Sequence, residues 1–150
     1  MIRKLHDNKG AVCAEILATL PKWFGMLESN ARYISDVERM PMFVSEEGGR
    51  IEGFLALNQH TPHAIEIHVM GVRPERHRVG LGRTMIERAQ IFARERGARF
   101  LTVKTRSPSA PDEGYLKTYA FYLGVGFLPI EEFPLLWNPE NPALMLLKVI

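Results

Sequence analysis

The loop from Arg73 to Gly82 holds the residues best suited to chemistry, because it gathers arginines and glycines directly before an amphipathic stretch. Apolar residues recur at helical spacing beyond it and predict a helix over 82–96. The first N–H groups of a helix have no partner within it, and the helix dipole favours negative charge there. Gly80 and Gly82 let a ligand approach without meeting a Cβ. The loop therefore predicts an anion site with pyrophosphate as its natural ligand, and an ordinary helix start is the alternative.

Local charge favours the anion site. Residues 73–106 carry ten Lys or Arg and three Glu, a local charge of +7 in a chain whose formal net charge is +2. Part of this excess is expected of any solvated helix face. We assign the arginines nearest the glycines to phosphates, because guanidinium groups bind phosphate in a bidentate manner. These arginines are Arg76, Arg78 and Arg83.

Two phosphate-binding motifs are excluded by residue identity. A Walker loop requires Gly-Lys-Ser or Gly-Lys-Thr, and neither occurs. A dinucleotide-binding fingerprint requires a third glycine where Met85 stands. Nucleotide hydrolysis and hydride transfer are therefore disfavoured.

Helices and strands are predicted in a mixed order, without an internal repeat. Residues 64–72 alternate apolar side chains with Glu66, His68 and Met70, which predicts a strand with one polar face. The other predicted elements are helices over 11–20, 23–40 (broken or in two pieces) and 115–123, a hairpin of 40–47 and 50–60 turning at Gly48-Gly49, and strands over 98–105, 127–133 and 143–150. This order indicates an α+β fold with a mostly antiparallel sheet.

Composition restricts the class of protein. With 150 residues, 46% of them hydrophobic and 24% charged, the chain is expected to form a single domain. Its small net charge argues against a nucleic-acid partner. The one cysteine, Cys13, lies on an apolar helix and is expected to be buried and inert rather than a nucleophile. No apolar run is long enough to span a membrane and no export signal is recognisable, so we expect a cytoplasmic protein.

Two motifs resemble those of the GCN5-related N-acetyltransferase (GNAT) superfamily. The acetyl-CoA signature of this superfamily is [Gln/Arg]-x-x-Gly-x-[Gly/Ala]. The segment His77-Arg78-Val79-Gly80-Leu81-Gly82 is similar to it. His77 departs from the first position. Downstream, Phe121-Tyr122-Leu123-Gly124-Val125-Gly126-Phe127 resembles the family's Phe-Tyr-x-x-x-Gly-Phe element, although Tyr115 and Thr118 replace the Asn and Ala that often precede it. The resemblance extends over residues 51–150, and the first 50 residues match in element order.

The resemblance implies a splayed, mostly antiparallel mixed sheet flanked by helices, with acetyl-CoA between the strand ending at Val72 and the strand through 100–105. It implies that the pyrophosphate lies on the glycine loop and that the pantetheine arm pairs with backbone near Met70, whose N–H polarises the acetyl carbonyl. The residues implied for acetyl-CoA are Met70, Gly71, Val72, His77, Arg78, Val79, Gly80, Leu81, Gly82 and Arg83.

Acetyl transfer to an amine needs a base for the amine, a site for the charge that develops on the carbonyl oxygen, and an acid for the leaving thiolate. The resemblance implies that Tyr122 is the acid, with a core tyrosine as the alternative. It places Glu66 where some members hold the base, with a surface carboxylate as the alternative. His68 is an equal candidate, because imidazole exchanges protons near neutral pH.

The function implied is an acetyl-CoA-dependent N-acetyltransferase that acts on a primary amine, with a small molecule as the preferred acceptor. A non-catalytic CoA-sensing or scaffold module is the alternative. No metal is expected, since His60, His63 and His68 lack ligand spacing. Members of the family often dimerise, and the apolar segment 143–150 is the candidate contact for a homodimer. Four aromatic residues either line the acceptor site or belong to the core: Trp23, Phe24, Tyr33 and Trp137.

Overall fold

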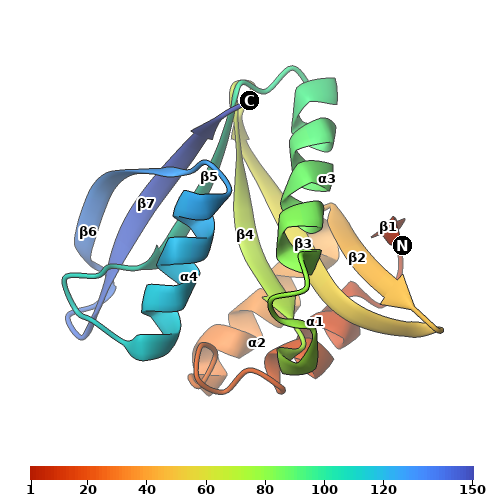
Figure 1. Cartoon of the computed structure of the whole chain (residues 1–150), viewed down its shortest axis with the longest axis horizontal. Helices are drawn as coiled ribbons and strands as arrows, with labels where there is room; N and C mark the ends of the chain where they lie inside the picture. Colours follow the sequence, from red (N-terminus) through yellow and green to blue (C-terminus); the bar gives the residue numbers. More distant parts are fainter. The chain divides into compact units, whose positions relative to one another are not determined.

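The computed structural model describes residues 1–150 and confirms the α+β fold (Figure 1). Seven strands form one mixed sheet in the order β1-β2-β3-β4-β5-β7-β6, flanked by four helices. The chain folds as two compact units, of which the first contains residues 1–58 and 67–92 and the second residues 59–66 and 93–150. None of the helices is long and apolar enough to cross a membrane.

The first unit contains the elements from β1 to α3. Strands β3 and β4 and the end of helix α3 continue into the second unit. The elements are β1 (Ile2–Leu5), α1 (Lys9–Leu17), α2 (Leu27–Asp36), the 3-10 turn η1 (Val37–Arg39), β2 (Met42–Glu47), β3 (Arg50–Thr61), β4 (Ala64–Val72), the 3-10 turn η2 (Pro74–Arg76) and α3 (Leu81–Glu95).

The β2–β3 hairpin forms where the sequence predicts it. Gly48 and Gly49 have φ of 59° and 79°, the left-handed pair that a tight hairpin turn requires. The turn joins Glu47 to its antiparallel partner Arg50. Strand β1 pairs antiparallel with the other edge of β2 and was not expected, because its four residues are too short to show a strand period.

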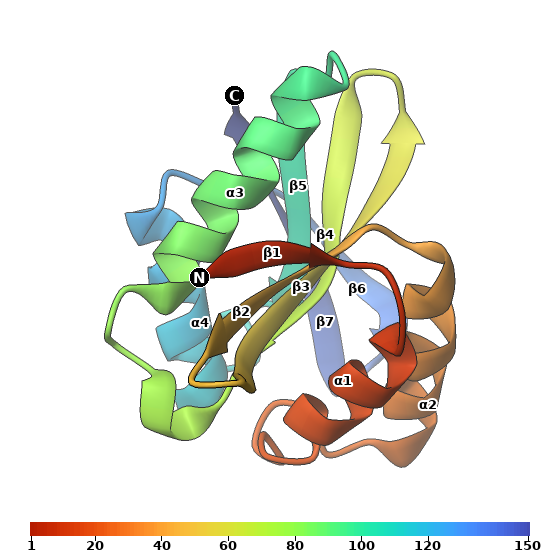
Figure 2. The same ribbon diagram turned by 90° about the vertical axis from the view of Figure 1, so that its right-hand side faces the viewer.

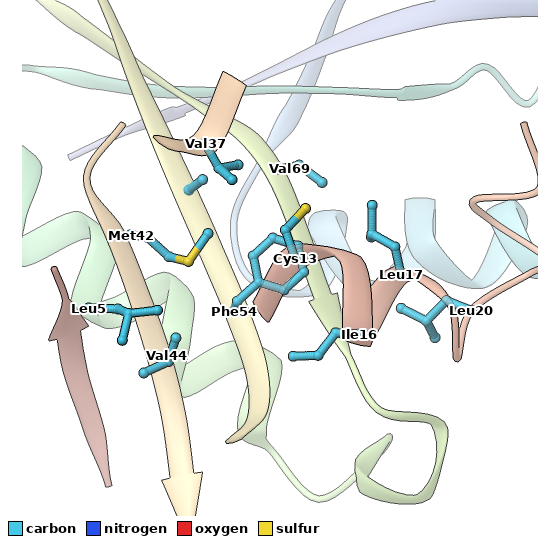
Figure 3. Close-up of a cluster of buried hydrophobic side chains, with 11 residues drawn as sticks. Leu5, Cys13, Ile16, Leu17, Leu20, Val37, Met42, Val44, Phe54 and Val69 are labelled. Atoms are coloured by element: carbon cyan, nitrogen blue, oxygen red, sulfur yellow. The ribbon is translucent and has the colours of Figure 1, made fainter. Parts of the chain in front are cut away.

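Strand alternation in β2 gives the first unit two packed faces. On one face, Met42 joins the buried cluster drawn in Figure 3, to which α1 contributes Cys13. On the other face, the Phe43 ring meets Phe92 of α3 edge-on at 5.4 Å between centroids. Cys13 is fully buried as expected, and burial raises the pKa of its thiol to about 12, so the thiol stays protonated at neutral pH. Helix α1 packs against α2 (Figure 2).

The second unit contains β5 (Phe100–Arg106), α4 (Glu113–Gly124), β6 (Leu128–Asn138) and β7 (Asn141–Val149). Helix α4 packs along β5 (Figure 1). It begins where the Asp112 side chain accepts a hydrogen bond from the Tyr115 backbone N–H at 3.2 Å, an N-cap that follows the Pro- and Ser-rich loop.

Segment 143–150, the candidate dimer contact, lies mostly in strand β7, between two neighbouring strands of the sheet. Strand β7, which contains most of segment 143–150, pairs antiparallel with β5 on one edge and with β6 on the other, so both of its edges are used within the chain. The strand is apolar because it lies inside the sheet. Large apolar side chains are exposed instead on β6, at Leu128, Ile130, Leu135, Leu136 and Trp137.

Candidate functional site

The loop between β4 and α3 has the backbone geometry of an anion site. Arg78 and Gly80 both have positive φ, 64° and 83°. A left-handed conformation is costly for a residue with a side chain, and such strain collects at ligand-binding segments. The first hydrogen bond of α3 runs from Thr84 N to Gly80 O at 3.1 Å, so the preceding N–H groups have no partner within the helix. A Cβ added at Gly80 would meet nothing within 4 Å, so this side of the loop is open.

Ion pairs tie the loop to helix α1 and strand β2. The buried Arg73 donates from Nε to the Ile51 carbonyl at 2.9 Å and pairs with Glu15 at 3.0 Å. Arg76 pairs with Glu47 at 2.6 Å. Of the three arginines assigned to phosphates, Arg76 is therefore already engaged by a carboxylate and acts first in positioning the loop.

His77, which departs from the family signature, closes the loop onto β4. Its Nε2 is hydrogen-bonded to the Val72 carbonyl at 2.7 Å, and the Trp23 ring stands edge-on to its ring at 5.7 Å. The side chain of His77 thus shapes the loop.

Gly71 is explained by core packing. A Cβ at this position would lie 3.1–3.2 Å from side-chain atoms of Leu20, Ile16 and Phe54. Only backbone groups of Gly71 are left to contact a ligand.

Glu66 is a buried carboxylate with two less buried partners. One carboxylate oxygen accepts from Lys104 Nζ at 2.6 Å, and the other is hydrogen-bonded to His60 Nε2 at 2.7 Å. Burial raises the pKa of Glu66, but the hydrogen bonds and charges of Lys104 and His60 outweigh it, and the net pKa is lowered. Glu66 is therefore not a surface carboxylate, and at neutral pH it is ionised with both oxygens engaged.

His68 has a different partner. Its Nε2 lies 3.0 Å from Oδ2 of Asp36, the last residue of α2, and the Tyr33 ring meets it edge-on at 5.6 Å. Asp36 was not predicted from the sequence, because it lies 32 residues from His68 and belongs to no motif. An acidic residue at the C-terminal end of a helix, where the dipole disfavours it, is the one signal that could have found it.

The second motif is a tight turn between α4 and β6. Gly126 has φ of 100°, and Phe127 N donates to the Tyr122 carbonyl at 3.0 Å, which ends the helix. The turn brings the Phe127 ring to 5.5 Å from the buried Tyr122 ring, and Phe121 flanks Tyr122 at 5.3 Å. The spacing of the motif thus places Tyr122 in an aromatic shell.

The aromatic residues of the α1–α2 segment lie around the site in the first unit. Phe24 contacts Tyr33, which contacts His68, while Trp23 contacts His77. Trp137 lies on β6, partly exposed.

The protein is an α+β fold in which a loop with two left-handed residues leads into the N-terminus of α3. The chain belongs to the acetyltransferase (GNAT) family, whose sequence profile matches residues 13–121. None of the curated proteins compared with it matches the chain.

Several solved acetyltransferase structures are similar over the whole chain. A GNAT family acetyltransferase from Elizabethkingia anophelis with acetyl-CoA bound has a TM-score of 0.78 at 13% identity, covering 100% of this chain and 97% of that one. An aminoglycoside 6'-N-acetyltransferase complexed with coenzyme A has a TM-score of 0.77 at 14% identity, with 99% and 96% covered. A ribosomal-protein-alanine N-acetyltransferase from Brucella melitensis has a TM-score of 0.70 at 19% identity, with 100% and 99% covered. At these identities the likeness establishes the fold.

Proposed function

We propose that the chain is an acetyl-CoA-dependent N-acetyltransferase that acts in the cytoplasm on a primary amine of a small molecule. The observation that carries this proposal is the loop into α3 in a chain of the GNAT family, where Arg78 and Gly80 hold left-handed backbone conformations just before the first hydrogen bond within the helix. The fold itself leaves the acceptor open, since one relative is an aminoglycoside acetyltransferase and another a ribosomal-protein-alanine acetyltransferase.

The loop residues fit the phosphates of acetyl-CoA. The open side of Gly80 accommodates a pyrophosphate, backbone N–H groups of residues 80–83 donate to it, and Arg78 and Arg83 supply charge. His77 and Val79 complete the loop, with Leu81 and Gly82 in the first helical turn. Backbone groups of Met70, Gly71 and Val72 are the partners for the pantetheine arm. Acetyl-CoA supplies the acetyl group as a thioester.

Of the two base candidates, the geometry favours His68. Glu66 would have to take a proton on a carboxylate whose pKa is lowered and whose oxygens are both engaged, whereas the Nδ1 lone pair of His68 is not used by Asp36. His68 accepts one proton from the ammonium group, and the amine nitrogen then bonds to the acetyl carbon. Tyr122 protonates the sulfur as the C–S bond breaks, and it regains a proton from the new amide nitrogen through solvent. The backbone N–H near Met70 stabilises the charge on the carbonyl oxygen.

The test is calorimetric titration with acetyl-CoA, followed by thiol release with a panel of amines: kanamycin, spermidine, tryptamine and an alanine-terminated peptide. We expect binding with amine-dependent release from at least one small amine. Release with the peptide alone would overturn the small-molecule acceptor. Absence of acetyl-CoA binding would overturn the whole proposal.

Two variants separate catalysis from binding. Tyr122→Phe is expected to lower kcat at least 10-fold, with acetyl-CoA affinity unchanged, because only the proton donor is lost. Gly80→Val is expected to weaken acetyl-CoA binding, because a branched side chain at positive φ strains the loop and fills its open side. Binding without release from any amine would favour the CoA-sensing module.

We also propose that any homodimer forms through β6 rather than β7. This strand has only β7 as a partner and exposes a row of large apolar side chains, which is uncommon on a monomer surface. Sedimentation of the wild type and of Leu135→Glu over a range of concentrations tests this. A dimer that the substitution leaves intact would contradict it.

A further inference from the structure

We propose that Asp36 is a positioning residue that fixes the tautomer and orientation of the His68 imidazole, so that Nδ1 is the nitrogen that takes the amine proton. This inference rests on the proposed function for its catalytic part. Its geometric part, the fixed tautomer, stands on contacts within the first unit alone.

The hydrogen bond decides which nitrogen carries the proton. An ionised carboxylate only accepts hydrogen bonds, so at 3.0 Å from Asp36 Oδ2 the Nε2 of His68 must carry the hydrogen. In the neutral ring the lone pair is then on Nδ1. A histidine without this partner would exchange between two tautomers, only one of which presents the lone pair at Nδ1.

Neighbouring groups hold the ring and its partner in place. The Tyr33 ring stands edge-on to the imidazole at an interplanar angle of 78°, which opposes rotation of the ring out of the hydrogen bond. Tyr33 and Asp36 are both on α2, one turn apart, so a single helix face supplies both contacts. The side chain of His68 is 21% exposed, which leaves it accessible to a small amine while limiting competition from water for the hydrogen bond.

The position of Asp36 in α2 does not stabilise the charge of its carboxylate. Asp36 is the last residue of α2, where the helix dipole disfavours a carboxylate. Its other charged contact, to Arg39 at 3.7 Å, involves a guanidinium that is 76% exposed and is therefore weak. The contact with His68 is the closer of the two.

The test uses ¹⁵N-histidine-labelled protein and compares the wild type with Asp36→Asn and Asp36→Glu. Long-range ¹H–¹⁵N spectra above pH 8 report the tautomer of His68 directly, without any acceptor. We expect the wild type to show hydrogen on Nε2, Asp36→Asn to show a mixture, and Asp36→Glu to restore the wild-type signature in part. Assignment of the signal comes from His68→Gln.

Kinetics with the most active amine of the panel supply the second readout. We expect Asp36→Asn to lower kcat about 10- to 100-fold, with KM for acetyl-CoA unchanged and partial rescue by Asp36→Glu. Arg39→Ala is the matched control, because it removes the second partner of Asp36 but keeps the carboxylate, and both its tautomer and its kcat are expected to stay within twofold of the wild type.

The outcomes distinguish this inference from the proposed function. A wild-type His68 with hydrogen on Nδ1, or an Asp36→Asn variant with an unchanged tautomer and unchanged kcat, would overturn the role of Asp36. A wild type that turns over no amine but whose tautomer shifts in Asp36→Asn would overturn the proposed function and leave the positioning role in place.

Discussion

Strand β4 carries two carboxylate–histidine pairs whose surroundings are opposite. In the Glu66–His60 pair the carboxylate is on the strand and is 8% exposed, while the histidine is 49% exposed. In the Asp36–His68 pair the histidine is on the strand and is 21% exposed, while the carboxylate is 33% exposed. The two hydrogen bonds are similar in length, 2.7 Å and 3.0 Å.

The two pairs differ in which member is the more buried. Glu66 is the more buried member of its pair and has a second partner, the Lys104 ammonium group, at 2.6 Å, so its surroundings stabilise the negative charge. His68 is the more buried member of the other pair and has a single carboxylate on Nε2, which leaves Nδ1 for proton transfer. This contrast supports the proposal that His68, rather than Glu66, is the base.

The largest expected effect compares substitutions at the two β4 residues. His68→Gln is expected to lower kcat at least 100-fold, because general-base catalysis is worth about 10²–10⁴-fold, while acetyl-CoA affinity stays unchanged. Glu66→Gln, which keeps the shape of the side chain, is expected to lower kcat less than threefold. Thiol release and calorimetric titration measure both, and the reverse ranking would assign the base to Glu66.

The fold could be predicted in most of its elements because periodicity and turn residues are local signals. The strand over 64–72, the Gly48-Gly49 hairpin and the helix after Gly80 are where the sequence predicts them. Strand β1 was missed because four residues show no period. The last strand was predicted, but its apolar run does not show whether it is covered within the chain or by a second copy.

The site could be predicted only where it is local in sequence. The glycine loop is a contiguous segment, so its position follows from one stretch of chain, whereas the left-handed conformation at Arg78 was not predicted. Two partners of the β4 residues, Asp36 on α2 and Lys104 on β5, lie 32 and 38 residues away in sequence. Tertiary packing brings these groups together, and the spacing of residues along β4 does not predict such distant partners.

The next largest effect concerns stability. Lys104→Met would leave the buried Glu66 carboxylate without its ammonium partner. We expect this change to lower the free energy of unfolding by about 2 kcal/mol, less than the usual loss for a fully buried pair because Lys104 is 26% exposed. Urea denaturation measures this loss. The double variant Glu66→Gln with Lys104→Met is the control and should recover part of it, because no buried charge is left unpaired. Equal losses in both variants would contradict the ion-pair account.

A smaller effect is expected in the pH dependence of stability. The pKa of Glu66 is lowered in the folded state from its ordinary value of 4.5, so the unfolded chain takes up this proton first as pH falls. The carboxylate thus stabilises the fold above about pH 4.5, and this contribution is lost as the pH falls through the lowered pKa. The stability difference between wild type and Glu66→Gln should therefore shrink between pH 6 and pH 3, measured by urea denaturation at each pH. A stability difference that grows as the pH falls would show that the ionised Glu66 side chain destabilises the folded state.

The smallest effect is expected at the exposed histidine of the first pair. His60→Ala removes a side chain that is 49% exposed, and Lys104 continues to pair with Glu66, so we expect a loss of about 0.5 kcal/mol in the free energy of unfolding. The turnover number should be unchanged, in contrast to the large loss in His68→Gln. Urea denaturation and thiol release measure the two quantities on the same preparation. A loss of kcat in His60→Ala comparable to that in His68→Gln would mean that the Glu66–His60 pair takes part in proton transfer, and the distinction between the two pairs would fail.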